Sequence, residues 1–249
     1  MINFIKKIIL TSEMTGMKIK AVLFDLDNTL VNFFKVKTMA IENAVSAMID
    51  AGLKAPKEKV IAILDKIYKE KGIEYQNVFD DLLKELEGTI NPKFLAAGIV
   101  AYRRVKHAYL DPYPGVVPTL IELIKRGYKI GIISDASRLQ VWTRLCDMRL
   151  EHLFDFVICF EDSGEEKPST LPFKAAVNKL KLRPEEILMV GDMIEKDVLG
   201  AQKLGIKTAL ANYGKRSHFA VGFRERTIPA GIKPDYTIND LHEILNLLN

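Results

Sequence analysis

The segment KIKAVLFDLDNTLV, residues 18–31, decides how the rest of the chain is interpreted. Its apolar run Ala21–Phe24 is continuous rather than alternating, which is typical of a strand buried on both faces of a sheet. Asp25 and Asp27 follow directly, so the run ends in carboxylates. We therefore predict a central parallel strand whose carboxyl end carries two acidic side chains.

Similar short apolar runs recur further along the chain, at Ile130–Ile133, Phe156–Phe160, Ile187–Val190 and Thr208–Leu210. Helical patterns separate them, at Val116–Arg126, Leu139–Met148, Leu171–Leu180 and Lys196–Leu204. Strands that alternate with helices are typical of an α/β protein with a doubly wound parallel sheet. The sequence therefore predicts this fold class for most of the chain.

One stretch breaks the alternation, because it contains helical patterns and no convincing strand. The expected helices are Thr38–Ala51, Pro56–Lys71, Asn77–Glu87 and a fourth from Asn91 to about His107. The turn-forming segment DPYPG at 111–115 then leads back to the sheet. We predict an N-terminal extension at 1–17, a core domain at 18–32 and 111–249, and an inserted helical-bundle cap domain at 33–110.

The composition argues against some functional classes but does not identify the function. The 249 residues carry 36 basic and 32 acidic side chains, a net charge of +4 that gives no specific reason to expect nucleic acid. No run approaches the roughly 18 apolar residues that suggest a membrane helix, and Ile8–Leu10 is too short for a signal peptide. We expect a cytoplasmic protein that does not bind membranes. A late basic cluster reads as surface charge that could also contact a second subunit: Lys215, Arg216, Arg224 and Arg226.

Polar side chains follow several of the predicted strands, where ligands bind in open α/β sheets. They are Asp25, Asp27, Ser134, Asp135, Lys167, Asp192 and Asp197. Crowded carboxylates resist ionisation unless a divalent cation binds, and an all-oxygen set suits Mg²⁺. A hydroxyl and an ammonium complement phosphoryl oxygens, and an aspartate can accept a phosphoryl group. The sequence thus predicts a magnesium and phosphate site at one edge of the sheet.

The order of these motifs resembles the haloacid dehalogenase superfamily of phosphatases. FDLDNTLV at 24–31, IISD at 132–135, Lys167-Pro168 and GDMIEKD at 191–197 occur in the order found there. The helical insert is similar to the mobile cap of the first type, which marks subfamily I. The resemblance implies a Rossmann-like core with Mg²⁺ as cofactor.

The resemblance also assigns a role to each residue. It implies that Asp25 is the nucleophile, and that Asp27 is the general acid and base and lends its backbone carbonyl to Mg²⁺. Asp25 and Asp192 would ligate the metal as well, and Asp197 would orient the waters of the metal or Lys167. Phosphate binding would fall to Ser134, Asp135 and Lys167, with Thr29 bracing the first loop.

Asp27 separates the subclasses, because the dehalogenases lack an aspartate at that position and work without Mg²⁺. We therefore expect a magnesium-dependent phosphatase that hydrolyses a small phosphate ester through an aspartyl-phosphate, in a chain compatible with a homodimer. A phosphosugar mutase would share every motif. A phosphoacceptor signalling module also combines such residues, but it is usually about half as long. One cap cluster is either a solvated face or a contact for the distal group of the substrate: Tyr102, Arg103, Arg104, Lys106 and His107.

Overall fold

The computed structural model describes residues 18–214 and 230–248. The predicted extension at 1–17 and the basic cluster at Lys215, Arg216, Arg224 and Arg226 lie outside the described residues. Within the described ranges, no helix is both long and apolar enough to cross a membrane.

The centre of the molecule is a six-stranded sheet in the order β3-β2-β1-β4-β5-β6, with every neighbouring pair parallel. The strands are β1 (Ala21–Phe24), β2 (Lys129–Ile133), β3 (Phe156–Ile158), β4 (Ile187–Gly191), β5 (Lys207–Ala211) and β6 (Tyr236–Ile238). Strand β1 lies between β2 and β4, and Phe24 at its end pairs with Ile132 and with Val190. The carboxyl ends of β1, β2 and β4 therefore meet at one place on the sheet edge.

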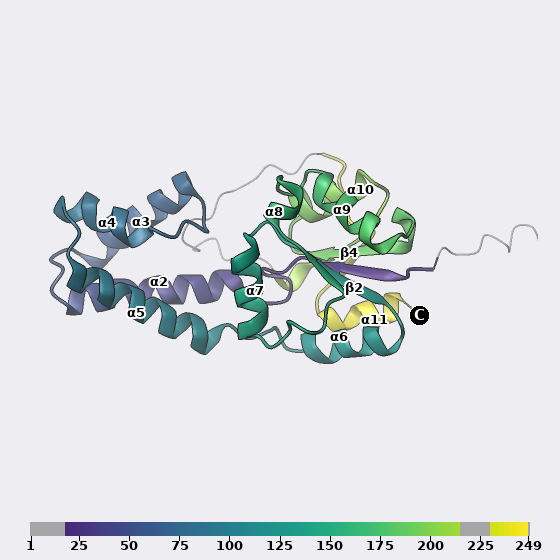
Figure 1. Cartoon of the computed structure of the whole chain (residues 1–249), viewed down its shortest axis with the longest axis horizontal. Helices are drawn as coiled ribbons and strands as arrows, with labels where there is room; N and C mark the ends of the chain where they lie inside the picture. The colour runs from purple at the N-terminus through teal and green to yellow at the C-terminus, as the bar shows by residue number, and fades with distance from the viewer. Residues whose placement is uncertain (1–17, 215–229, 249) are drawn as a thin grey trace, which may run out of the picture.

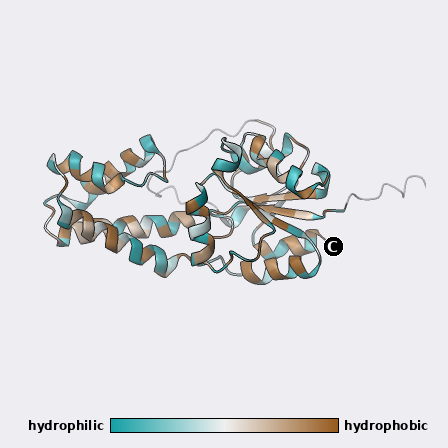
Figure 2. Cartoon of the chain, in the orientation of Figure 1, coloured by the Kyte–Doolittle hydropathy of each residue, from teal (hydrophilic) through white to brown (hydrophobic). Residues whose placement is uncertain are grey.

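Both faces of the sheet are covered, which explains the continuous apolar run of β1 (Figures 1 and 2). Val22 and Phe24 belong to one apolar cluster, and Ala21 and Leu23 belong to another. The first cluster includes side chains of α6 (Val116–Lys125), α7 (Arg138–Asp147) and α11 (Ile244–Leu247). The second includes side chains of α9 (Leu171–Leu180) and α10 (Leu199–Gln202). The predicted doubly wound parallel sheet is confirmed.

Some predicted boundaries were wrong. The run Phe156–Phe160 ends as a strand at Ile158, because the backbone N–H of Cys159 bonds the Asp162 carboxylate at 2.8 Å and opens helix α8 (Phe160–Ser163). The helix expected from Lys196 begins earlier, as the π-helical turn η2 (Ile194–Val198). Short 3-10 turns complete the core: η1 (Pro184–Glu186), η3 (Asn212–Gly214) and η4 (Leu241–Glu243).

The inserted helices form a bundle beside the sheet (Figure 1). They are α2 (Phe33–Asp50), α3 (Lys57–Lys71), α4 (Val78–Glu87) and α5 (Pro92–Tyr109). The bundle has its own apolar core, which includes Ile41, Leu64 and Leu82. Helices α2 and α5 approach closely at Gly98, where an added Cβ would lie 2.0 Å from the Cε of Met48. The predicted helical cap is therefore confirmed as part of the fold.

Candidate active site

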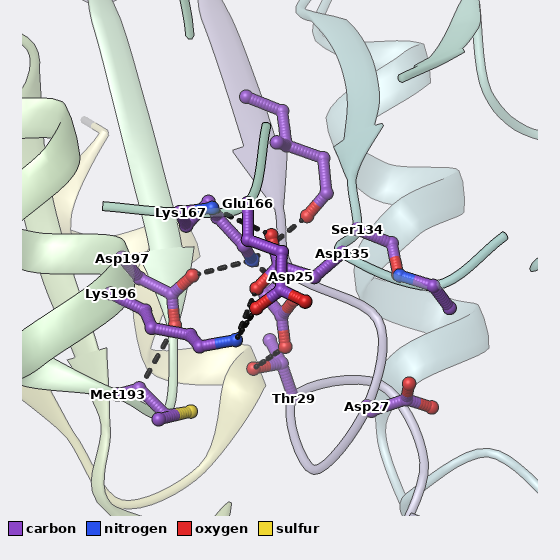
Figure 3. A network of polar contacts seen from close by, with 12 residues as sticks. Asp25, Asp27, Thr29, Ser134, Asp135, Glu166, Lys167, Met193, Lys196 and Asp197 are labelled. Carbon is purple, nitrogen blue, oxygen red and sulfur yellow. Dashed lines mark hydrogen bonds and ion pairs between the residues drawn. The ribbon is translucent and has the colours of Figure 1, made fainter. Parts of the chain in front are cut away.

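Five predicted residues line one cavity where β1, β2 and β4 end, and Figure 3 labels Asp25, Ser134, Lys167 and Asp197 among them. We call them the strand-end cluster: Asp25, Ser134, Lys167, Asp192 and Asp197. The sheet register places Asp25 beside β4, since its N–H bonds the Val190 carbonyl at 2.9 Å. Asp25 is 8% exposed and Lys167 only 2%, so their charges are largely removed from solvent.

The Lys167 ammonium joins the cluster together. It donates to Oδ1 of Asp25 at 2.5 Å, to Oδ1 of Asp197 at 2.6 Å and to the Ile133 carbonyl at 3.0 Å. Burial alone would lower the pKa of the Lys167 ammonium, but the carboxylates of Asp197 and Asp25 raise it well above its usual range. Lys167 therefore keeps its positive charge beside the predicted nucleophile.

The surroundings of Asp25 disfavour its ionised form. Burial raises the pKa of Asp25 to about 6 even though Lys167 lowers it, and Asp197 adds a further increase. The Oγ1 of Thr29 lies 3.5 Å from Oδ2 of Asp25, so this hydroxyl contributes only a long contact. An additional cation near Asp25 would favour its ionised form.

The acidic groups are arranged to receive such a cation. Asp25, Asp192 and Asp197 each offer a carboxylate oxygen, and these oxygens lie within 4.8 Å of one another. Hard oxygen donors of this kind suit Mg²⁺. Asp197 approaches closely because residue 191 is glycine, since an added Cβ would lie 2.3 Å from the Asp197 carboxyl carbon. Its Oδ2 accepts the Met193 N–H at 3.0 Å, which fixes its orientation.

Ser134 and Asp135 follow β2 and lie beside the cluster. Ser134 is 5% exposed, and its Oγ accepts the Ala136 N–H at 3.2 Å. The Asp135 carboxylate accepts the Lys167 backbone N–H at 2.8 Å and the Lys196 ammonium at 2.5 Å. Burial would raise the pKa of Asp135, but Lys167 and Lys196 hold it below its usual value. We expect any phosphate contact at Asp135 to come from its backbone, because its carboxylate is already occupied.

Asp27 stands apart from the strand-end cluster (Figure 3). Its Oδ2 lies 3.3 Å from Nη1 of Arg144 on α7, and Nη2 of Arg144 donates a short hydrogen bond to Oε1 of Glu74. We call Asp27, Arg144 and Glu74 the boundary cluster, because Glu74 belongs to the cap and the other two to the core. Burial raises the pKa of Asp27 to about 7 although Arg144 lowers it, so Asp27 exchanges a proton in the neutral pH range.

Both clusters adjoin a cavity of about 590 Å³ between the sheet edge and the helical bundle. The core contributes all of the strand-end cluster and Asp27 to its wall. The cap contributes Phe34, Tyr68, Lys71, Glu74 and Tyr75, among others. The predicted basic cap cluster is absent from this wall. Arg103, Arg104 and His107 instead line a separate hollow on α5.

Sequence reasoning missed Arg144, Glu74 and Lys196. Arg144 carried a readable signal, because it shares the buried side of α7 with Val141 and Leu145, where a charged residue needs a partner. Lys196 lies inside the last motif, directly before Asp197. Glu74 has no local signal, since it becomes part of the site only when the cap loop reaches the core.

The chain is similar to known proteins in sequence and in fold. The family model "Haloacid dehalogenase-like hydrolase" matches residues 22–211. A glyceraldehyde 3-phosphate phosphatase of Methanocaldococcus jannaschii is 38% identical over 92% of this chain and 97% of its own length. One of the same name from Pyrococcus furiosus is 35% identical over 93% of each chain.

A solved structure shares the architecture. It is a putative hydrolase of this superfamily from Bacillus subtilis, described as bound to magnesium and as revealing interdomain movement. It superposes with a TM-score of 0.64 at 20% identity, covering 93% of this chain and 99% of its own. At that identity the likeness concerns the fold. Together with the family match and the archaeal relatives, it confirms the resemblance drawn from the motifs: this chain belongs to the haloacid dehalogenase-like hydrolases.

Proposed function

We propose that this hydrolase is a magnesium-dependent phosphatase whose substrate is glyceraldehyde 3-phosphate. Its archaeal relatives carry the name of that activity and match nearly the whole chain. The observation that carries the chemistry is the buried Asp25 carboxylate, held by Lys167 beside two further carboxylates at the wall of a cavity. A small phosphorylated metabolite is the substrate class that such a cavity accommodates.

The proposed reaction has two steps, both centred on Asp25. Its carboxylate attacks phosphorus in line and forms an aspartyl-phosphate, while Asp27 gives a proton to the leaving oxygen. Asp27 then takes a proton from water, which attacks the aspartyl-phosphate and releases inorganic phosphate. Lys167 and the Ser134 hydroxyl stabilise the charge on the phosphoryl oxygens throughout.

The donor set fits Mg²⁺. In the proposal, the carboxylates of Asp25 and Asp192 and the backbone carbonyl of Asp27 hold the ion, and Asp197 keeps Lys167 in place. The bound ion supplies positive charge that offsets the carboxylates and the phosphoryl oxygens. The high pKa of Asp25 in the protein alone is consistent with a site that becomes fully ionised only with a cation.

The helical cap supplies the side of the cavity that faces the rest of the substrate. We assign residues 33–110 to this cap domain and 18–32 with 111–249 to the core domain. The Lys71 ammonium and the Tyr75 hydroxyl both bond Oδ2 of Asp81, at 2.6 and 2.7 Å, and so form a fixed polar group on the cavity wall. Such a group can hydrogen-bond the hydroxyl and carbonyl of a three-carbon phosphate.

The test measures inorganic phosphate released from a panel of phosphate esters, with Mg²⁺ and with EDTA. The panel contains glyceraldehyde 3-phosphate, dihydroxyacetone phosphate, glycerol 3-phosphate, 3-phosphoglycerate, glucose 1-phosphate and pyrophosphate. We expect the highest kcat/KM for glyceraldehyde 3-phosphate, by about tenfold or more, and no turnover in EDTA. Equal turnover across the panel would refute the substrate. Conversion of a sugar phosphate to its isomer without phosphate release would favour a mutase.

A further inference from the structure

Arg144 is the largest of the fully buried side chains, with 1% of its surface exposed. It contacts three parts of the chain. Its Nη1 lies 3.3 Å from Asp27, its Nη2 bonds Glu74, and its Cζ lies 4.3 Å from the centroid of the Phe33 ring at the start of α2. One side chain of a core helix therefore touches the predicted general acid and two elements of the cap.

The two carboxylates do not hold the guanidinium equally. Glu74 has the hydrogen bond, whereas the contact with Asp27 is an ion pair in which Nη1 makes no hydrogen bond to any described residue. The Oδ1 of Asp27 is likewise buried without a hydrogen-bond partner in the described part of the chain. Electrostatic attraction thus holds the Asp27 carboxyl near Arg144, but no hydrogen bond to the guanidinium fixes it. The carboxyl can therefore still move the short distance needed to reach a leaving oxygen.

Glu74 remains ionised in this setting, which keeps Arg144 in place. Burial would raise the pKa of Glu74, but Arg144 and Lys37 hold it below its usual value. The planar guanidinium has donors in a fixed fork, so anchoring one side by Glu74 fixes where the other side faces Asp27. Arg144 itself is not among the residues that line the cavity, so it acts through Asp27 and not on the substrate.

A buried ion pair of this kind is a poor source of stability, because removing charges from water costs about as much as their attraction returns. Replacing a whole buried set of charged partners by well-packed apolar side chains is often neutral for stability, whereas removing one partner alone leaves a buried charge unpaired. The arrangement is therefore better explained by orientation than by stability.

We propose that Arg144 is a positioning residue that places the carboxyl of Asp27, and that Glu74 of the cap fixes Arg144 in that position. Docking of the loop between α3 and α4 is then coupled to the placement of the proton donor. This inference rests on the proposed function, since it uses Asp27 as the acid for the leaving oxygen.

Two substrates with different leaving groups separate positioning from folding. An alkyl phosphate such as glyceraldehyde 3-phosphate needs a proton on its leaving oxygen, whereas p-nitrophenolate leaves readily without one. In Arg144→Gln we expect kcat for the alkyl phosphate to fall about 100-fold or more, which is the usual size of general-acid catalysis. The kcat for p-nitrophenyl phosphate should fall less than about tenfold, and KM should change little for either substrate.

The matched control is Arg138→Gln, on the same helix, where Arg138 pairs with Asp162 at 2.7 Å on the surface. It should leave both substrates at the wild-type rates. Arg144→Lys keeps the positive charge but loses the forked donors, so its kcat for the alkyl phosphate should lie between those of the wild type and Arg144→Gln. The double variant Arg144→Gln/Glu74→Gln removes the charge left unpaired in the single variant, and it decides the outcome if Arg144→Gln does not fold.

The ratio of alkyl to aryl kcat decides the inference. A selective loss for the alkyl phosphate, in Arg144→Gln and in the folded double variant, supports it. An equal loss for both substrates, or recovery of the alkyl rate in the double variant, would overturn it, because Arg144 would then serve only to neutralise Glu74. If the wild-type protein with Mg²⁺ releases phosphate from neither substrate, the proposed function fails instead.

Discussion

The strand-end cluster and the boundary cluster adjoin the same cavity but are built in different ways. The first is made from the ends of strands in one sheet, and the three hydrogen bonds of the Lys167 ammonium that connect it are all to core residues. The second forms only when a cap loop brings Glu74 to a core helix. The strand-end cluster therefore depends on the sheet alone, whereas the boundary cluster depends on both the sheet side and the inserted helical bundle. Variants in the two clusters should therefore fail in different ways.

The largest expected effect is at the nucleophile. Asp25→Asn keeps the shape of the side chain but removes the attacking carboxylate, so kcat should fall by about four orders of magnitude or more for every substrate. The far-ultraviolet circular dichroism should remain that of the wild type. Phosphate release near the wild-type rate in this variant would refute the two-step mechanism.

Lys167→Gln should damage both activity and stability, because it leaves two buried carboxylates without their cation. We expect kcat to fall about 100- to 1,000-fold and the free energy of unfolding to drop by about 3 kcal/mol. Lys129→Gln is the control, since Lys129 bonds Asp155 at 2.8 Å on the surface. Denaturant unfolding of both variants, with and without Mg²⁺, gives the comparison. A stability loss as small as that of the control would contradict the account of the cluster.

Glu74→Gln alters the boundary cluster at its cap residue and leaves the residues of the core unchanged. The amide still fits beside Arg144 but has no negative charge, so we expect kcat for the alkyl phosphate to fall about tenfold and the aryl rate to change little. The matched change is Glu85→Gln, where a cap glutamate pairs with Lys66 at 3.3 Å on the surface. If both glutamine variants behave alike, the cap loop does not influence the proton donor.

The smallest expected effect is at Glu186, which precedes β4 at the end of the sheet opposite the candidate active site. Hydrogen bonds from Lys20 and from the Arg183 backbone hold the pKa of Glu186 at about 2, below the usual 4.5. A lowered folded-state pKa stabilises the protein above about pH 4.5, and this contribution is lost as the pH falls toward 2. Glu186→Gln should lower the Tm at pH 7 and approach the wild-type Tm in acid, with unchanged kcat. A constant Tm difference from pH 7 to pH 3 would contradict the assignment.

The elements that were predicted well have strong local patterns. β1 was placed correctly because its continuous apolar run is buried on both faces. β6 (Tyr236–Ile238) was missed because it is a short edge strand in which only Ile238 is buried. The run at Phe156–Phe160 was extended too far, because Cys159 and Phe160 are apolar but belong to a helix start.

The candidate site likewise contains residues with a local sequence signal and residues without one. Asp25, Lys167 and Asp197 could be identified from ordered motifs, because parallel strands bring their ends together whatever lies between them. The partner of Asp27 could not be identified, since Arg144 and Glu74 meet across the domain boundary and no sequence spacing relates them. Their separation along the chain is 70 residues.

The three bonds of the Lys167 ammonium have a consequence for turnover. An ammonium has three N–H donors, and all three are used within the protein, by Asp25, Asp197 and the Ile133 carbonyl. An arriving phosphoryl group therefore gains this cation only by exchanging with an internal acceptor. The same acceptors stand ready to reclaim the ammonium after hydrolysis. These internal acceptors thus compete with bound inorganic phosphate for the Lys167 ammonium. The competition weakens retention of the phosphate and returns the site to its starting state for the next substrate.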